Sequence, residues 1–158
     1  MDIRPAQDQD VEFEAYCRLL TELDSLHSQA EPRYYRSPER PARPRDYFRS
    51  LCGEGEGGLF LAWQGSEAVG LLSFDVQTFA HPVVVPRRMF YINDMVVAGA
   101  HQRRGVGRAL MAAARAWAQA HACTDLRLAV QTFNQGALAF YQAQGFAVQT
   151  IMLVRALD

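Results

Sequence analysis

Apolar positions recur with two periods along the first half of the chain, and they predict both helices and strands. From Val11 to Leu26 they return at helical spacing, with acidic residues early, where the helix dipole favours them. Two apolar stretches around Gly65-Ser66 indicate a hairpin. The predicted elements are a strand at Asp2–Ala6, that helix, a short helix through Tyr47, Phe48 and Leu51, and hairpin strands at Leu59–Gln64 and Glu67–Phe79.

The second half alternates strand and helix patterns. Between His27 and Arg45, prolines are expected to interrupt regular structure, and Pro82 and Pro86 are expected to end the hairpin. The elements predicted after them are a strand at Phe90–Val97, a helix at Gly107–His121, a strand at Leu126–Val130, a helix from Asn134 and a final strand pair between Phe146 and Leu157. The predicted order is therefore β-α-α-β-β-β-α-β-α-β-β.

The loop from Gln102 to Arg108 is the most informative segment, because two glycines join a strand to a helix there. The first N–H groups of a helix lack partners within the helix and carry the positive end of its dipole, so they can bind an anion. Glycine lets a phosphate approach the backbone and permits a positive φ. The loop therefore predicts a phosphate site; the alternative is a tight turn with exposed arginines.

The spacing separates three kinds of phosphate loop. A dinucleotide fingerprint would need a glycine where Leu110 stands, and a P-loop would need Gly-Lys-Ser/Thr in a chain that has no lysine. The pattern Gln102-x-x-Gly105-x-Gly107 instead resembles the acyl-CoA pyrophosphate loop of the GNAT superfamily, the N-acyltransferases that use acetyl-CoA.

A second segment, from Asn134 to Phe146, resembles the other GNAT signature. In that signature an asparagine starts a helix that ends in Phe-Tyr, followed by three residues and Gly-Phe. Asn134 suits a helix N-cap and Gly145 suits the position after a helix end. Alone, this is an ordinary capped amphipathic helix, but the two motifs also follow each other in the order and spacing of the family.

The resemblance covers nearly the whole chain and implies its architecture. It implies one GNAT acetyltransferase domain over residues 1–158, of the α/β class, with a mostly antiparallel mixed sheet flanked by helices. The fourth and fifth strands would start side by side and splay apart, and pantetheine would enter that cleft. A length of 158 residues, of which 49% are hydrophobic, suits one globular domain.

The resemblance also implies the residues that bind acetyl-CoA. Backbone N–H groups of the loop would cradle the pyrophosphate, and the strand before it would pair with the pantetheine amides. The amide of Val96 or Met95 would point at the thioester oxygen, and Asn134 would bond the pantetheine arm. The implied cofactor-binding residues are Met95, Val96, Val97, Gln102, Arg103, Arg104, Gly105, Val106, Gly107, Arg108, Asn134 and Tyr141.

Tyr141 matches the family tyrosine that protonates the departing thiolate. A free tyrosine has a pKa of about 10 and a free thiol one of about 8.5, so the phenol would stay protonated and available. The alternative is a tyrosine whose ring only packs against the sheet.

The general base departs from the family pattern. Asn93 occupies the strand position at which many members carry glutamate or histidine, and an amide cannot accept the proton. We expect a base that works through water held by Asn93, or an amine that arrives neutral. Asp94 should face the other side of the sheet unless a bulge rotates the strand, and it is otherwise interpreted as a structural carboxylate. The candidate catalytic residues are Tyr141, Asn93 and Asp94.

The sequence says least about the identity of the amine that accepts the acetyl group. In the family, the segment between the first two helices roofs the acceptor site. A cationic, aromatic roof would suit an acceptor with a carboxylate; the alternative is a solvated loop. The residues concerned are Tyr34, Tyr35, Arg36, Arg40, Arg43, Arg45 and Tyr47, with Arg87 and Arg88 before the next strand.

Composition limits the partners and the compartment. A net charge of -1 argues against nucleic acid or an anionic membrane, and no apolar run is long enough to span a bilayer. The N-terminus lacks the apolar stretch of a secretory signal, so we expect a cytoplasmic protein. The histidines and the three scattered cysteines show no metal-ligand spacing, so no metal is expected.

Two functions remain open at this point. The first is transfer of the acetyl group from acetyl-CoA directly to a primary amine of a small molecule, such as an amino acid, a polyamine or an aminoglycoside-like compound, or of a peptide. The second is an acyl-CoA-binding module with little catalysis, which the missing carboxylate at Asn93 favours. The apolar segment Ile151–Val154 is a candidate for pairing across a homodimer.

Overall fold

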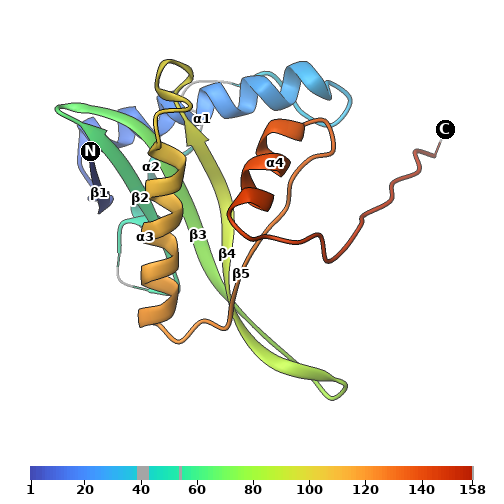
Figure 1. Cartoon of the computed structure of the whole chain (residues 1–158). Coiled ribbons are helices and arrows are strands. Elements are labelled where there is room, and N and C mark those ends of the chain that lie inside the picture. Colours follow the sequence, from blue (N-terminus) through green and yellow to red (C-terminus); the bar gives the residue numbers. More distant parts are fainter. Residues whose placement is uncertain (39–42, 54, 158) are drawn as a thin grey trace.

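The structure is a computed structural model that describes residues 1–38, 43–53 and 55–157. Its elements follow the predicted order as far as the last helix (Figure 1). They are β1 (Asp2–Pro5), α1 (Asp10–Ala30), α2 (Arg45–Leu51), β2 (Gly57–Gln64), β3 (Glu67–His81), β4 (Val84–Val97), a 3-10 turn at Gly99–His101, α3 (Val106–Ala120), β5 (Asp125–Leu128) and α4 (Gln135–Ala143).

The five strands form one sheet in sequence order. Neighbours from β1 to β4 are antiparallel, and β5 lies parallel to β4 at the edge. The parallel step is possible because α3 lies between these two strands in the sequence and supplies the crossover. The predicted α/β class, with a mostly antiparallel sheet flanked by helices, is confirmed.

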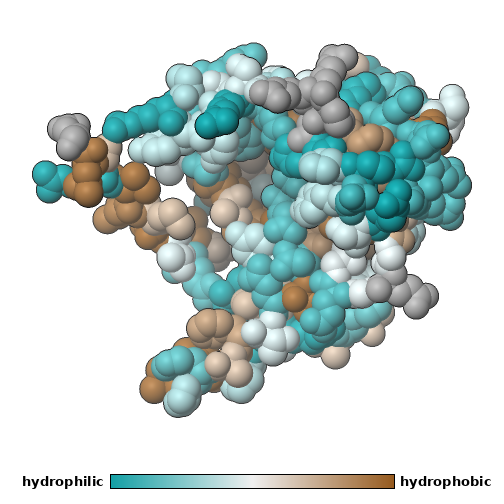
Figure 2. All heavy atoms as spheres, turned by 180° about the vertical axis from the view of Figure 1, so that it is seen from behind, coloured by the Kyte–Doolittle hydropathy of each residue, from teal (hydrophilic) through white to brown (hydrophobic). Residues whose placement is uncertain are grey.

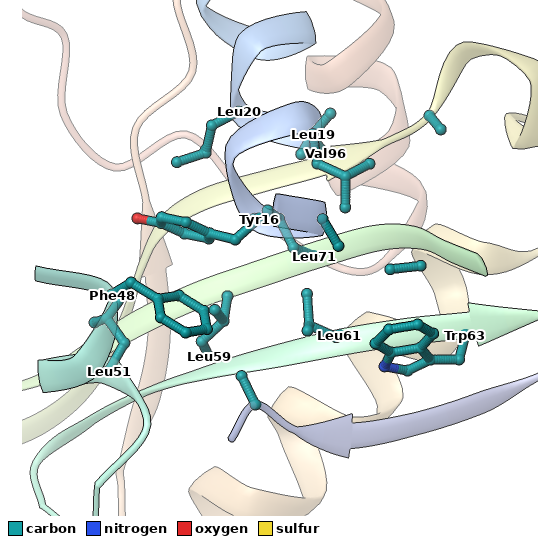
Figure 3. Packing of buried hydrophobic residues seen from close by; sticks show 14 residues of the cluster. Tyr16, Leu19, Leu20, Phe48, Leu51, Leu59, Leu61, Trp63, Leu71 and Val96 are labelled. Atoms are coloured by element: carbon teal, nitrogen blue, oxygen red, sulfur yellow. The ribbon is translucent and has the colours of Figure 1, made fainter. Parts of the chain in front are cut away.

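Two apolar clusters hold helices against the opposite faces of this sheet. On one face, Tyr16 of α1 and Phe48 of α2 pack over Leu59 and Leu71 (Figure 3). On the other face, α3 packs over Leu72, the neighbour of Leu71, because successive strand residues point to opposite sides. Since Leu71 and Leu72 are both buried, β3 is a central strand whose apolar run is continuous.

The strands β3 and β4 form a second hairpin and are longer than predicted, since β3 ends at His81 rather than Phe79 and β4 begins at Val84 rather than Phe90. The two strands remain paired out to His81 and Val84, and Pro82 lies in the turn rather than ending the pairing earlier. The register is irregular between Phe79 and His81, and Pro86, which has no N–H to donate, is not among the paired residues there. The hairpin tip, residues 79–85, therefore projects beyond the sheet (Figure 1).

The predicted final strand pair between Phe146 and Leu157 is wrong. Residues 147–157, called the C-terminal arm below, form neither helix nor strand. The arm runs outward from the body of the molecule (Figure 1), and a strand needs a neighbouring strand to exchange backbone hydrogen bonds. Other boundaries differ by a few residues: α1 continues through His27 to Ala30, and β5 ends at Leu128 rather than Val130.

A buried carboxylate holds the start of α1. Glu12 is 1% exposed, and its Oε2 accepts the backbone N–H of Gln7 at 2.5 Å. Arg4 contributes a longer contact of 3.4 Å to Oε1. The side chain thus reaches back beyond the helix N-terminus and binds a backbone donor two residues before the N-cap residue, Gln9.

Glu12→Ala should therefore destabilise the protein by about 1 to 3 kcal/mol, because it removes a buried carboxylate together with the acceptor of the Gln7 N–H, a hydrogen bond that is partly buried. Urea unfolding measures the change. Glu14→Ala, which removes an exposed carboxylate two residues along the same helix, is the matched control and should change stability by less than about 0.5 kcal/mol. Equal losses in both variants would contradict the assigned role of Glu12.

Candidate active site

A cleft opens where β4 and β5 separate. The two strands pair only over Met89–Ile92 and Asp125–Leu128; β4 then continues to Val97, whereas β5 stops. A cavity of about 360 Å³ lies at this separation. It is lined by Leu23, Asp24 and His27 of α1, by Tyr35 and Arg43, by Ile92–Met95 of β4, by Leu128–Gln131, and by Asn134, Ala137 and Tyr141. The cleft implied between the fourth and fifth strands is thus present.

A bulge in β4 determines which side chains face this cavity. Ser73 pairs with Asp94 but its neighbour Phe74 pairs with Ile92, so Asn93 is the extra residue of β4. One extra residue shifts the alternation of the strand, so that the residues after the bulge point to the opposite face from the one expected in a regular strand. Ile92 consequently packs in the α3 cluster, whereas Val96 packs in the α1 cluster and Asp94 shares its face.

The expectation for a regular strand, in which Asp94 lies on the far side of the sheet from Asn93, does not hold, because the bulge that was allowed as the exception is present. The bulge leaves both side chains in the wall of the cavity. The Nδ2 group of Asn93 donates to Asp75 Oδ1 at 2.7 Å, and the Ser73 hydroxyl donates to Asp94 Oδ2 at 2.8 Å. Ser73 also accepts the Asp94 N–H at 3.1 Å. Asp94 is thus held in place, and within residues 1–38, 43–53 and 55–157 its Oδ1 accepts no hydrogen bond.

The loop between β4 and α3 presents unpaired backbone donors. Gly105 adopts a φ of 86° before the first turn of α3, and Arg103 also has a positive φ of 61°. The side chain of Gln102 braces the loop by donating to the Val97 carbonyl at 3.2 Å. In the described part of the chain, none of the N–H groups from Arg103 to Arg108 donates a hydrogen bond. The loop can therefore bind an anion at the N-terminus of a fifteen-residue helix.

Gly107 serves a close packing contact. A Cβ at this position would lie 3.2 Å from Met95 Cε and 3.2 Å from Phe140 Cζ, both of which are tighter than ordinary van der Waals contact. Gly107 thus lets α4 approach the start of α3. It is Gly105, and not Gly107, that supplies the positive φ of the turn.

The second motif forms the opposite wall. Asn134 caps α4 as predicted, because its Oδ1 accepts the Ala137 N–H at 3.0 Å; its Nδ2 has no acceptor among the described residues. Gly145, with a φ of 90°, ends the helix as predicted. Tyr141 lies edge-on to Phe140 and Phe146, at ring distances of 5.2 and 5.6 Å.

The Tyr141 phenol stays protonated over a wide pH range. Burial raises the pKa of Tyr141 to about 12, since the phenolate would lose its hydration. The ring packs against its neighbours, as the structural interpretation of this residue requires, and the same side chain also lines the cavity. Tyr141 can therefore pack against its neighbours and still present its side chain to the cavity.

Two residues of α1, Asp24 and His27, line the cavity although neither was among the predicted site residues. Arg43 forms a paired contact with Asp24, at 2.8 and 3.2 Å, in the wall of the cavity. His27 Nδ1 lies 2.9 Å from the Leu23 carbonyl; because a carbonyl only accepts, Nδ1 carries the proton and Nε2 of the neutral ring does not. No local motif signals Asp24 or His27, although the four-residue spacing of Leu23 and His27 shows that those two residues share a helix face.

Comparison with known proteins decides the family. The model of the Acetyltransferase (GNAT) family matches residues 21–146, which include both motifs. The chain belongs to this family. It is accordingly an acyl-CoA-dependent N-acetyltransferase. No curated protein matches the sequence.

Solved structures share the GNAT fold. A mutant of the BH1408 protein from Bacillus halodurans matches with a TM-score of 0.93 and 24% identity over 100% of both chains. The aminoglycoside N-acetyltransferase AAC(6')-Iy, in complex with CoA, matches with a TM-score of 0.71 and 16% identity over 99% of this chain and 100% of its own. The aminoglycoside 6'-N-acetyltransferase AAC(6')-IG from Acinetobacter haemolyticus matches with a TM-score of 0.68 and 19% identity over 100% of both.

The cations of the GNAT roof segment are mostly paired. Arg45 binds Asp8 and Asp10 beside the start of α1, at 2.6 and 2.7 Å, and Arg43 is paired with Asp24. Arg88 binds Glu56 at 2.6 Å. Arg40 lies outside the described residues. The expected cationic roof is thus largely neutralised by the chain's own carboxylates.

A larger cavity of about 520 Å³ lies between the end of α2, the start of β2 and the end of α3, but neither GNAT motif contributes to it. In residues 1–38, 43–53 and 55–157, no helix has the length and apolarity to cross a membrane. The same residues contain no group of three or more histidine, cysteine or carboxylate side chains placed to bind a metal.

Proposed function

We propose that the chain, acting as one domain over residues 1–158, transfers the acetyl group of acetyl-CoA directly to a primary amine of a small cationic molecule. The observation that carries this proposal is the open edge of β4 from Asn93 to Val97. It leads from the unpaired N–H groups of the loop to the cavity that Tyr141 lines. One cleft therefore holds donors for a phosphate, donors and acceptors for an extended chain, and an acid.

The loop and β4 bind the cosubstrate in this proposal. The N–H groups of Arg103, Arg104, Gly105, Val106, Gly107 and Arg108 hold the pyrophosphate, with the helix dipole behind them. The backbone of Met95, Val96 and Val97 pairs with the pantetheine amides, because β3 occupies only one of its two edges. Gln102 braces the loop, and Asn134 offers its free Nδ2 to the pantetheine arm.

Tyr141 is the acid. A thiolate leaves when the amine displaces it from the acetyl group, and a proton from the Tyr141 hydroxyl neutralises it. The raised pKa of Tyr141 keeps that proton in place until the thiolate forms. A β4 N–H group, that of Val96 or Met95, stabilises the carbonyl oxygen as it gains negative charge.

Asp94 is the proton acceptor for the incoming amine. The bulge turns it toward α1 and into the cavity wall, and its Oδ1 is unoccupied by described donors. Asn93, tied to Asp75, can hold a water between amine and carboxylate through its own Oδ1. His27 is the second candidate, because its Nε2 is basic in the neutral ring.

The charges of the cavity favour a cationic acceptor. Among the described residues of its wall, Asp24 and Asp94 face one arginine, Arg43, which Asp24 already binds. Tyr35 and Tyr141 add aromatic surface. A polyamine or an aminoglycoside-like amine fits these groups better than an acceptor with a carboxylate, and aminoglycoside acetyltransferases are among the structures with this fold.

Gly107→Val should raise the dissociation constant of CoA about 10- to 100-fold, the equivalent of one lost charge-assisted hydrogen bond. The added methyl groups would collide with Phe140 and displace the first N–H groups of α3. Isothermal titration measures the affinity. Gly99→Val, at a glycine with open space around it, is the matched control and should bind CoA normally. Normal binding by Gly107→Val would exclude the phosphate-loop assignment.

Tyr141→Phe should lower kcat about 100-fold while leaving the affinity for CoA within a few-fold of the wild type, because only the acid is removed. Release of free thiol from acetyl-CoA, in the presence of polyamines and aminoglycosides, measures the rate. Tyr34→Phe, at an exposed tyrosine outside the cavity, is the control. An unchanged rate in Tyr141→Phe would refute the acid role.

Asp94→Asn should lower kcat/KM about 100-fold at neutral pH, because an amide cannot take the proton. His27→Gln is run beside it under the same conditions and should retain most activity. The opposite result, a loss confined to His27→Gln, would make His27 the base. Normal rates in both variants would mean that the amine reaches the cleft already neutral.

A further inference from the structure

A hydrogen bond bridges the rim of the active-site cavity. The Gln131 Nε2 group donates to the Tyr35 hydroxyl at 2.7 Å, although the two residues are 96 positions apart in the sequence. Both side chains line the cavity, and because Tyr35 is half-buried and Gln131 is exposed, the bond lies on the solvent side. Figure 1 shows the two segments concerned, one after α1 and one before α4, next to each other. The segment after α1 is thereby joined to the wall beyond β5.

An aromatic cluster joins the same two segments. The His27 ring lies 5.0 Å from the Tyr35 ring and 5.5 Å from the Phe133 ring, which it meets edge-on. A lone exposed hydrogen bond exchanges readily with water, and the ring contacts hold its two ends close together. The hydrogen bond between Tyr35 and Gln131, with the rings of His27 and Phe133 beside it, is called the clasp below.

Short turns fix both ends of the clasp. On one side the N–H groups of Glu31 and Tyr35 bind the carbonyls of His27 and Glu31, at 2.8 and 3.0 Å, so Tyr35 is held on the end of α1. On the other side the Gln131 carbonyl accepts the Asn134 N–H at 2.9 Å. The clasp therefore lies one turn away from the residue proposed to bind the pantetheine arm.

The space beneath the clasp is small. The molecule is hollowed between α1 and α4 (Figure 2), and the cavity there measures about 360 Å³. Sites for small molecules run from about 300 to 1,000 Å³, so this one is near the lower limit, and it must also admit the acetyl end of the cosubstrate. An extended alkyl amine needs the width of one methylene row, whereas an amine on a sugar needs the width of the ring.

We propose that the clasp selects the acceptor: closed over the cavity, it favours linear diamines and polyamines over amines carried on sugar rings. This selectivity rests on the proposed acetyl transfer to a small cationic amine and narrows the acceptor to one class. Asp24 and the Tyr35 ring line the cavity together with Asp94. A linear amine can therefore place its reacting nitrogen at Asp94 and a second ammonium at the Asp24 carboxylate or over the Tyr35 ring.

The first test compares two acceptors. We expect kcat/KM of the wild type to be at least about 10-fold higher for spermidine than for kanamycin. Tyr35→Phe and Gln131→Ala each remove one partner of the bond and should lower this ratio about 2- to 10-fold, the effect of one hydrogen bond. Tyr34→Phe and Thr132→Ala, at exposed neighbouring residues outside the cavity wall, are the matched controls and should keep the ratio.

A double variant separates the clasp from two independent structural losses. If Tyr35 and Gln131 act through one hydrogen bond, combining Tyr35→Phe with Gln131→Ala should change the ratio no more than either single substitution does. A wild type that acetylates kanamycin as well as spermidine, or single effects that multiply in the double variant, would overturn the clasp.

Binding measurements separate the clasp from acetyl transfer. Isothermal titration of spermidine and of kanamycin into the CoA-saturated protein requires no reaction. A preference for spermidine that falls in Tyr35→Phe supports the clasp even if neither amine is acetylated, and in that case the proposed transfer alone is wrong. Acetylation of both amines with the same ratio in every variant leaves the transfer standing and overturns the clasp. A protein that neither binds nor acetylates either amine overturns both.

Discussion

The separation of β4 from β5 is the constraint on which the site depends. A sheet normally satisfies the backbone groups of adjacent strands along their whole length, but here the parallel pairing ends at Ile92 while β4 continues for five more residues. Of those residues, Asp94 to Val97 keep one edge paired with β3, and no strand lies along their other edge. Backbone donors and acceptors that are exposed in a cleft bind an extended ligand well, because the ligand replaces water rather than protein partners.

The bulge at Asn93 couples this opening to the chemistry. In a regular strand Ile92 and Asp94 would share a face, and burying Ile92 against α3 would carry Asp94 into the same apolar cluster. The extra residue lets Ile92 remain in the core while Asp94 faces α1. There the Ser73 hydroxyl donates a hydrogen bond to Asp94, and Asp94 lines the cavity. A single inserted residue thus allows an apolar core position and a charged cavity position to lie two residues apart.

Sequence alone predicted the parts of this structure that local rules determine. The cap at Asn134, the helix end at Gly145 and the turn at Gly105 follow from conformational preferences of single residues, and the order of elements follows from periodicity as far as α4. The bulge was foreseen only as an exception, because nothing in Ile92-Asn93-Asp94 distinguishes it from a regular strand. The groups from α1 were missed because tertiary packing, which no local pattern records, brings Asp24 and His27 to the cleft.

The error at the C-terminus has a different cause. Ile151-Met152-Leu153-Val154 has the apolar, β-branched composition of a strand, and composition of this kind reports that a segment suits a sheet without reporting which sheet. Among the residues that the structure describes, the segment pairs with no strand, and the outer edge of β5 has no neighbouring strand either. An open edge and an unpaired strand-like segment in one molecule are complementary to each other.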